Sequence, residues 1–403
     1  MTPPPRSARV GIRSIPAGLV TAFLLASCQT VGGVHSFRSS AAPGSASVAA
    51  EAEWSTPTAA PVETIPRVEV RVEGLDAILH SAAGVDPAFQ SDVRDWMRSW
   101  TTGQASSFER YLQRMREYDG LVLEELLERG LPGSLRYLPI VESGYIPSAV
   151  SRVGATGLWQ LMDPTARELG LTVSSIVDDR RDPVASTHAA LEYLEALHVR
   201  FDSWFLALAA YNAGPNRVQR LLDRYAPGEG SGDESYFEIL PHLPAETRQF
   251  VPRFFAAATL ASDRDTHGFE ASTEGTVRFD EVAVPDATSL DVVARAAGVE
   301  EASILALNPQ YLRGFTPAGE TRIVRVPEGR AARFARNFAE IPPEERLTVL
   351  EHVVTSGETF THIARRYGVP VSDLTDMNGS VDPRRLQIGM RLVVPVGGVD
   401  GDT

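Results

Sequence analysis

The sequence predicts a multidomain, mainly helical protein that ends in small α+β modules, and three observations predict this fold class. Apolar residues recur at three- and four-residue steps between about residues 89 and 127, which is the period of helices with one buried face. Asp-Pro pairs at 163–164 and 182–183 place a capping side chain before a proline at a helix start. A repeat with an offset of 70 residues follows, and each copy reads as strand, helix, helix and strand.

Length and charge limit what the chain can be. Its 403 residues, 43% of them hydrophobic, can form two to four compact domains. The net charge of −14 argues against nucleic-acid binding, because no basic patch is available to neutralise phosphates, whereas a neutral polysaccharide remains compatible. His188 and His198 lack Cys or carboxylate partners at ligand spacing, so we expect no metal site and no cofactor.

The N-terminus predicts a lipoprotein signal peptide over residues 1–27. A basic segment precedes an apolar run from Ile15 to Ala26, which is too short to span a membrane comfortably. The run ends in Leu-Ala-Ser-Cys28, which resembles a bacterial lipobox and implies lipidation of Cys28. The alternatives are an unprocessed anchor and a secreted protein with a stray cysteine. Gln29 after the cysteine favours the periplasmic face of the outer membrane over the inner membrane. Residues 28–66, rich in Ala, Ser, Pro and Thr, predict a flexible tether.

Two helical regions follow the tether. Residues 67–130 predict a helical lead-in that serves as scaffold, and residues 131–265 predict a further helical domain. Within the second region, the stretch from Trp204 to Tyr211 is apolar all round, which predicts a central buried helix. Another helix is expected from Pro244, with Glu246 in its first turn.

The stretch from Leu135 to Met162 carries the residues most suited to chemistry. An apolar run delivers Glu142 to a point where Ser-Gly and then Pro147 interrupt the helix. A carboxyl group with apolar neighbours and no adjacent cation has a raised pKa, and such a glutamate can act as a proton donor. Gly157, Trp159 and Gln160 then offer close backbone approach, an aromatic plane and an amide, which suit carbohydrate binding. Each motif alone also fits an ordinary helix end or a core tryptophan.

Taken together, these motifs resemble the lysozyme-like lytic transglycosylases. The resemblance rests on Glu142-Ser143, Ser151, Gly154-Ala155-x-Gly157-Leu158-x-Gln160-x-Met162, Ala209-Ala210-Tyr211-Asn212-Ala213-Gly214 and Glu246-Thr247-Arg248. It implies a lysozyme-like helical catalytic domain with Glu142 as the catalytic residue. It also implies substrate binding by Ser143, Ser151, Gln160, Met162, Tyr211 and Asn212. Ser151 could equally cap a helix, Met162 could fill the core, and the Tyr211 hydroxyl could find an internal partner.

The sequence departs from the family pattern at one position of the candidate site. Phe250 stands where the family usually has tyrosine, so a phenol that would form a hydrogen bond at the active site is missing. The gap is expected to be filled either by solvent or by a compensating residue elsewhere.

The C-terminal repeat resembles LysM modules, which bind glycans containing N-acetylglucosamine. The second copy, residues 348–397, keeps the full pattern, including Gly357 before its first helix. The first copy, residues 277–329, has Ala287 at that position and predicts a degenerate, structural LysM-like unit. Residues 330–347 predict a linker.

The resemblance implies a peptidoglycan lytic transglycosylase that cleaves the β-1,4 bond between N-acetylmuramic acid (MurNAc) and N-acetylglucosamine (GlcNAc). Glu142 would act first as acid and then as base, leaving 1,6-anhydromuramic acid ends. Peptidoglycan strands would be both substrate and LysM ligand, and the membrane would be reached through the lipid anchor. The rival hypotheses are a muramidase that hydrolyses the same bond and a non-catalytic peptidoglycan-binding lipoprotein. The sequence leaves endo or exo action, stem-peptide preference and protein partners open.

Replacing the predicted lipidation site tests the anchoring hypothesis. We expect Cys28→Ala to move the protein from the membrane fraction to the soluble fraction, because Cys28 is the only thiol in the chain. Sedimentation of membranes, with Ser47→Ala in the predicted tether as control, measures this. A mutant that still sediments with membranes contradicts the prediction.

Overall fold

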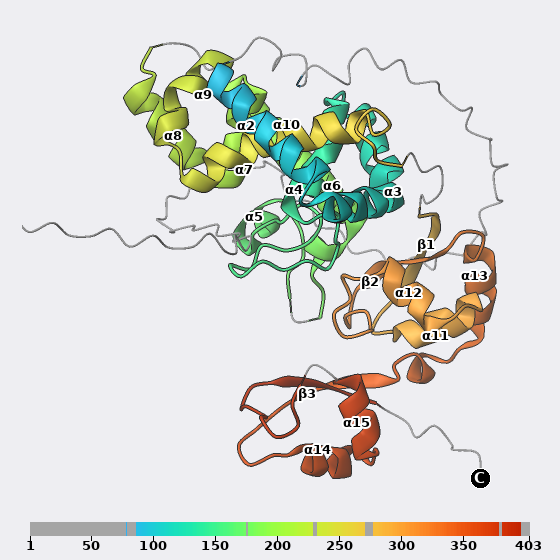
Figure 1. The fold of residues 1–403 in the computed structure, drawn as a ribbon. Coiled ribbons are helices and arrows are strands. Elements are labelled where there is room, and N and C mark those ends of the chain that lie inside the picture. The colour runs from blue at the N-terminus through green and yellow to red at the C-terminus, as the bar shows by residue number, and fades with distance from the viewer. Residues whose placement is uncertain are drawn as a thin grey trace, which may run out of the picture.

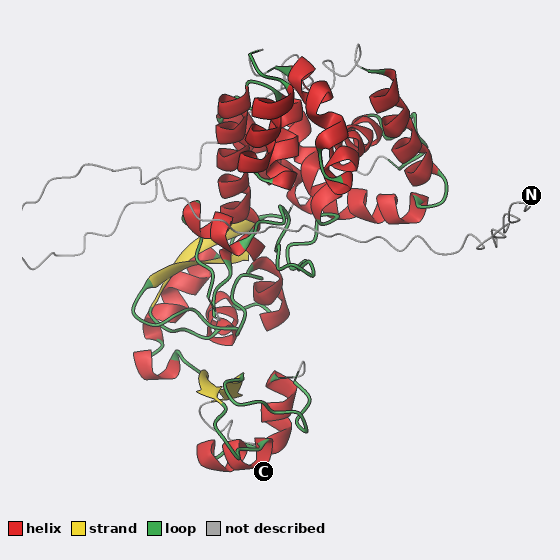
Figure 2. Cartoon of the chain, turned by 90° about the vertical axis from the view of Figure 1, so that its left-hand side faces the viewer, coloured by secondary structure: helices red, strands yellow, loops and turns green. Residues whose placement is uncertain are grey.

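The computed structural model describes residue 78 and residues 86–174, 176–228, 232–270, 277–378 and 381–395. These residues form a helical domain followed by two small modules (Figure 1). Figure 2 shows that the strands lie in the modules and the longer helices in the domain above them. The predicted signal peptide, Cys28 and the predicted tether lie outside the described residues.

Nine helices build the described part of the helical domain. Their bounds are α2 Pro87–Thr101, α3 Ala105–Glu128, α4 Leu138–Glu142, α5 Asp163–Glu168, α6 Pro183–Phe201, α7 Trp204–Ala213, α8 Pro215–Tyr225, α9 Asp233–Ile239 and α10 Ala245–Ser262. A 3₁₀ turn, Gly133–Tyr137, leads directly into α4. Helix α10 begins where Pro244 and Glu246 predicted it.

Side-chain caps fix several of these helix starts. The Asp86 carboxylate accepts hydrogen bonds from the first turn of α2 at 2.8 and 3.1 Å. Asp182 does the same for α6, also at 2.8 and 3.1 Å, with Pro183 at the first helical position as predicted. Helix α5 starts at Asp163, so Met162 rather than Asp163 is its N-cap.

The core of the helical domain is aromatic and includes the predicted lead-in. Phe89 from α2 lies 5.5 Å from the rings of Phe205 on α7 and Phe255 on α10, and 6.2 Å from Tyr236 on α9. Helix α7 is buried from Phe205 to Ala210, as its all-round apolar sequence predicted. Because α2 and α3 bury their apolar faces in this same core, they are part of one packed unit with the helices that follow.

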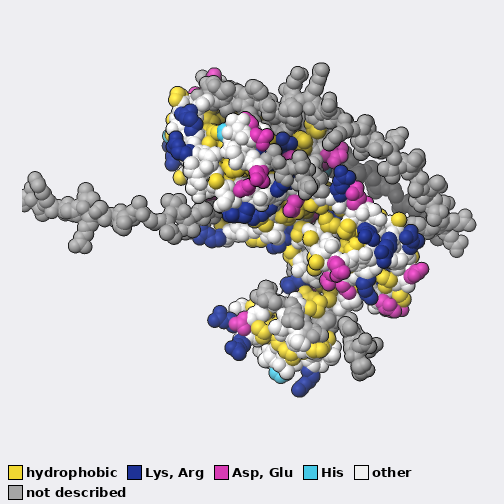
Figure 3. Space-filling model, turned by 45° about the vertical axis from the view of Figure 1, so that its right-hand side comes forward, with side chains coloured by type: hydrophobic (Ala, Val, Ile, Leu, Met, Phe, Trp, Pro, Cys, Tyr) yellow, Lys and Arg dark blue, Asp and Glu magenta, His cyan; other side chains and the backbone are white. Residues whose placement is uncertain are grey.

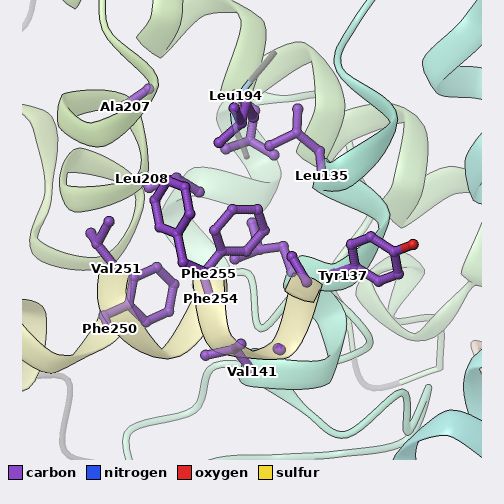
Figure 4. Packing of buried hydrophobic residues seen from close by; sticks show 14 of the residues in the cluster. Leu135, Tyr137, Val141, Leu194, Ala207, Leu208, Phe250, Val251, Phe254 and Phe255 are labelled. Atoms are coloured by element: carbon purple, nitrogen blue, oxygen red, sulfur yellow. The ribbon is translucent and has the colours of Figure 1, made fainter. Parts of the chain in front are cut away.

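Helix α10 packs against α4, the short helix that ends at Glu142. Phe254 and Phe255 on α10 lie in one buried cluster with Val141 of α4 and Leu208 of α7 (Figure 4). Phe250, one turn earlier on α10, is only 6% exposed and belongs to the same cluster. The last residue of α4, Glu142, is therefore held at the edge of a dry region.

The first module contains strands β1 Phe279–Pro285 and β2 Thr321–Pro327, which pair antiparallel, and helices α11 Leu290–Ala297 and α12 Glu301–Leu307. The predicted linker at 330–347 is wrong for most of its length. Residues Ala331–Glu340 form helix α13, whose Phe334 and Phe338 lie in the core of the first module. Their spacing of four places both rings on one helix face, which can be buried only against the module.

The second module repeats this plan with β3 Val349–Val353, α14 Phe360–Tyr367, α15 Val371–Met377 and β4 Arg391–Pro395. The repeat predicted from the offset of 70 residues is confirmed by two equivalent asparagines. The Asn308 amide donates to the carbonyls of Ile304 and Arg325 at 2.8 and 2.7 Å. The Asn378 amide donates to those of Leu374 and Val393, both at 2.7 Å. Each asparagine therefore ties a helix to the closing strand of its module.

Within the described residues, no helix is both long and apolar enough to cross a membrane. The same residues contain no group of three or more His, Cys, Asp or Glu side chains arranged to hold a metal ion. Acidic, basic and apolar side chains are interspersed on the face shown in Figure 3.

Two neighbouring glycines allow a test of this fold. Gly157 and Gly154 have φ of +88° and +86°, but only Gly157 is crowded, since an added Cβ would lie 1.8 Å from the Arg180 carbonyl oxygen. We expect Gly157→Ala to lower the free energy of unfolding by about 3 kcal/mol or more. Gly154→Ala, which adds only backbone strain, should cost about 1 kcal/mol. Urea unfolding measures both, and equal losses would contradict the close approach.

Candidate active site

Glu142 is the last residue of α4, and an unusual backbone turn follows it. Gly144 and Tyr145 both have positive φ, at +60° and +61°. A Cβ on Gly144 would lie 2.6 Å from the ring of Tyr111 on α3, so glycine is required there for close packing as well as for its conformation. The Tyr145 hydroxyl donates to the Arg136 carbonyl at 2.5 Å, which holds the strained residue in place.

The Glu142 carboxyl group has a raised pKa. It is partly buried, and its removal from water raises its pKa to about 8. The positive charge of Arg253 lowers this pKa and the negative charge of Glu246 raises it, but both effects are smaller than the loss of hydration. The sequence analysis predicted the direction of the shift correctly. It was wrong to expect no cation nearby, because Arg253 is more than a hundred residues away in the sequence and is brought in by α10.

Arg253 is held by aromatic rings from α2. Its guanidinium lies 5.4 Å from the ring centroid of Trp96 and 5.8 Å from that of Trp100. The Trp96 indole is oriented in turn by a hydrogen bond of 2.9 Å to Gln249 on α10. Burial lowers the pKa of Arg253, and its Nε has no hydrogen-bond partner among the residues that the structure describes. A guanidinium stays protonated in proteins, so a fixed positive charge faces Glu142.

The sequence left open whether the Tyr211 hydroxyl has an internal partner or is available to a substrate, and the structure shows an internal partner on a residue that is only partly buried. Its hydroxyl donates to the Trp159 carbonyl at 2.7 Å, which is an internal partner. The residue nevertheless remains partly exposed, and Glu142 is close enough to raise the pKa of its phenol, after the larger effect of burial. Tyr211 therefore stays a neutral phenol beside Glu142 and ties the end of α7 to the segment that carries Gln160.

Asn212 connects α7 with the start of α10. Its Oδ1 accepts a hydrogen bond of 2.7 Å from the hydroxyl of Thr247. Its side chain also forms a hydrogen bond with the Glu246 carboxylate, which lowers the pKa of Glu246 against the larger, opposite effect of burial. These two bonds fix the orientation of the Asn212 amide and bring Glu246 into the same site as Glu142.

Three of the remaining predicted site residues make mainly local hydrogen bonds. The Ser143 hydroxyl donates to the Leu158 carbonyl at 2.8 Å. The Ser151 hydroxyl accepts from the Ala155 amide at 2.9 Å, in a turn and not at a helix start. The Gln160 amide donates to the Gly157 carbonyl at 2.9 Å. All three side chains therefore shape the chain around Glu142, whatever they also offer to a ligand.

Met162 and Trp159 differ from the sequence-based expectation. Met162 is the half-buried N-cap residue of α5. The Trp159 ring is fully buried, with its indole donating to the Thr187 hydroxyl at 2.9 Å, so it is a core residue and offers no plane to a sugar. The close backbone approach at Gly157 is likewise made by the chain itself, at the Arg180 carbonyl.

The structure also shows what accompanies the loss of the family phenol. The Phe250 ring is buried in the core. A different phenol, that of Tyr111 on α3, packs over Gly144 and raises the pKa of Arg253. Tyr111 comes from the segment that the sequence suggested was scaffold only.

Sequence reasoning missed Arg253, Tyr111 and the tryptophan pair that holds the guanidinium. One signal could have found Arg253, because it follows Glu246 by seven residues, which is two turns along the same helix face. Nothing in the sequence pairs α2 or α3 with Glu142. The resulting site places a carboxyl group of raised pKa beside a cation and a second acidic residue, a combination that suits general acid-base chemistry.

Comparison with protein families finds three matches along the chain. The Transglycosylase SLT domain matches residues 125–230. The LysM-like domain of lytic transglycosylase MltD matches residues 278–342, which includes α13. The LysM domain matches residues 352–395.

Individual proteins and solved structures are also similar to parts of this chain. Membrane-bound lytic murein transglycosylase D of Escherichia coli is 31% identical over 296 residues, which cover 70% of this chain and 64% of that protein. A peptidoglycan transglycosylase of Escherichia phage T7 is 35% identical over 117 residues, covering 28% of this chain and 9% of that protein. The crystal structure of the 70 kDa soluble lytic transglycosylase of Escherichia coli is 27% identical, with a TM-score of 0.31, over 38% of this chain and 25% of that one.

The chain thus spans slightly less than two thirds of its Escherichia coli relative. Over that length 31% of the residues are identical. In sequence and in domain content the chain is an MltD-like lytic transglycosylase: an SLT domain is followed by an MltD-type LysM-like domain and a LysM domain.

Proposed function

We propose that this chain cleaves the β-1,4 bond between MurNAc and GlcNAc in peptidoglycan by lytic transglycosylation. The observation that carries the proposal is the raised pKa of Glu142, about 8, beside the fixed charge of Arg253. A carboxyl group that keeps its proton at neutral pH can give it to a glycosidic oxygen. The names of the relatives and the SLT match support the same activity.

Glu142 carries both proton transfers in this mechanism. In the first step its carboxyl group protonates the oxygen that links MurNAc to GlcNAc, and the C1–O bond breaks. The acetamido group of the substrate stabilises the resulting positive charge at C1. In the second step the Glu142 carboxylate takes the proton of the C6 hydroxyl while that oxygen bonds to C1, which closes the 1,6-anhydro ring and restores the acid.

The surrounding residues have complementary roles in the proposal. Arg253 stabilises the Glu142 carboxylate between the two steps, when the negative charge would otherwise be poorly solvated. Tyr211 and Asn212, whose side chains are fixed by hydrogen bonds of 2.7 Å, position the sugar and its acetamido group. Ser143, Ser151, Gln160 and Met162 line the same segment and complete the substrate site.

Hydrolysis of the same bond is the second candidate, and Glu246 favours it. This carboxylate lies close enough to raise the pKa of Glu142. Most glycoside hydrolases use two carboxyl groups, one on each side of the glycosidic bond. Glu246 forms a hydrogen bond with Asn212, however, which occupies part of its carboxylate.

The second module and the predicted lipidation site support a function in the cell envelope. We infer that the second module, which matches the LysM family, binds the glycan strands of peptidoglycan. The Escherichia coli relative is named a membrane-bound enzyme, which supports an envelope location for this chain. We propose lipidation at Cys28 and anchoring at the periplasmic face of the outer membrane. An intact, protonated acid in the SLT domain supports catalysis over wall binding alone.

Removing the acid tests the proposed activity. We expect Glu142→Gln to lower the release of soluble fragments from purified peptidoglycan by roughly 10²–10⁴-fold, because the amide can neither donate nor recover the proton. Wild-type products should carry the 1,6-anhydro ring and be one water lighter than hydrolytic products by mass spectrometry.

Two controls separate the alternatives. Glu168→Gln, at an exposed position on α5, should leave the rate unchanged. Glu246→Gln should retain anhydro products if the C6 hydroxyl attacks, whereas a hydrolase would lose its base. Reducing-end muramic acid as the main product rejects transglycosylation, and an active Glu142→Gln enzyme rejects the catalytic assignment.

The pH dependence of the rate tests the role of Arg253. The acid must be protonated, so kcat on a soluble glycan fragment should fall as the pH rises through about 8. Since Arg253 lowers the pKa of Glu142, Arg253→Met should move this alkaline limb to higher pH. Arg248→Met, an exposed arginine on the same helix, should not move it. A limb at the same pH in both variants would contradict the charge coupling.

A further inference from the structure

We propose that the first LysM-like module is a fixed part of the catalytic unit. Its docking on the helical domain positions the active-site loop. The docking loop is defined here as residues 172–174 and 176–182, and the active-site loop as residues 151–162. The proposal rests on the function proposed above, but its structural part can be tested without measuring activity.

The docking loop pairs with the first module through its backbone. The Asp178 amide donates to the Gln310 carbonyl at 2.9 Å, and the Leu312 amide donates to the Ile176 carbonyl at 2.8 Å. Val177, which lies between Ile176 and Asp178, is 1% exposed and belongs to the core cluster of the module. The docking loop thus contributes a side chain to a core that belongs to another domain.

Two ion pairs across this interface are shielded from water. Arg325 on β2 lies 2.8 Å from Asp182, with the two side chains 6% and 9% exposed. Arg322 on the same strand lies 2.7 Å from Asp179, with side chains 19% and 13% exposed. A buried pair adds little net stability, but separating the partners leaves each arginine with only a longer contact, to Glu281 at 3.3 Å or to Glu320 at 3.7 Å. Such pairs therefore favour one orientation of the module over all others.

Arg180, which lies between Asp179 and Asp182 in the sequence, connects the docking loop to the active-site loop. It forms two hydrogen bonds with Asp178, at 2.8 and 2.9 Å. Its remaining terminal nitrogen donates to the carbonyls of Gly154 at 2.9 Å and Leu161 at 3.2 Å. Its own carbonyl packs against Gly157 so closely that no side chain fits there. Three residues of the active-site loop, Gly154, Gly157 and Leu161, therefore contact Arg180 of the docking loop.

The active-site loop is connected in turn to the acid. The Leu158 carbonyl accepts the hydrogen bond of Ser143, the residue after Glu142. The Trp159 carbonyl accepts that of Tyr211. A shift of the docking loop would move these carbonyls relative to Glu142, and small displacements of positioning groups reduce rates strongly.

Weakening the interface in the full-length protein tests the proposal. The variant is Arg322→Gln with Arg325→Gln, and the control is Arg278→Gln with Arg336→Gln, which removes the same charge from exposed positions on the same module. Hydrogen–deuterium exchange reports the interface at residues 310–312 and the active-site loop at 151–162. Steady-state kinetics on a soluble peptidoglycan tetrasaccharide and a pull-down with insoluble peptidoglycan complete the set.

We expect faster exchange in both segments and a kcat/KM lower by roughly ten- to a hundredfold in the interface variant only. Binding to insoluble peptidoglycan should stay within about twofold, since we assign it to the second module. Circular dichroism checks that the helices remain folded. If the double variant unfolds, Arg322→Gln alone, at the more exposed pair, should show the same pattern with smaller changes.

Several results would overturn the proposal. Faster exchange at 310–312 with an unchanged active-site loop and rate would mean that docking does not position the site. Unchanged exchange at 310–312 would mean that the ion pairs do not hold the module. A wild-type protein without activity would reject the proposed function instead, and the exchange measurements would still decide the structural coupling.

Discussion

The burial of one carboxyl group at the end of a five-residue helix is the constraint on which the rest of the helical domain depends. Helix α4 is too short to be stable alone and is held by α10, which packs across it. The same helix carries Arg253 and Glu246, the two charges that oppose each other at Glu142. The packing of α10 on α4 therefore influences both the position of the Glu142 carboxyl group and its pKa.

This arrangement makes the first helices part of the site. Trp96 and Trp100 on α2 hold the guanidinium that faces the acid, and Tyr111 on α3 covers the turn after it. A cation close to a buried acid needs a rigid support, because a mobile arginine would turn toward water. The aromatic rings provide that support, so the predicted lead-in and the helices around Glu142 form one packed unit.

The two modules share one fold but differ in their contacts with the helical domain. Both retain the asparagine that ties the helix to the closing strand, at positions 308 and 378. Only the first has a strand arginine pair that meets aspartates of the helical domain and an added helix, α13, that extends its core. Glycine has been lost from its first turn, consistent with a module whose surface is committed to its own chain.

The sequence by itself determined the helical period, the proline-capped starts, the repeat and the acid at 142, because these depend on residues near one another in the chain. It could also predict that burial would raise the pKa of Glu142. Only the tertiary structure decided which charges face that acid, since Arg253 and Glu246 arrive on a helix more than a hundred residues later. It likewise decided that Trp159 belongs to the core, that residues 331–340 form a helix, and that Arg180 supports the active-site loop. Such contacts arise from the packing of distant segments, for which no local pattern exists.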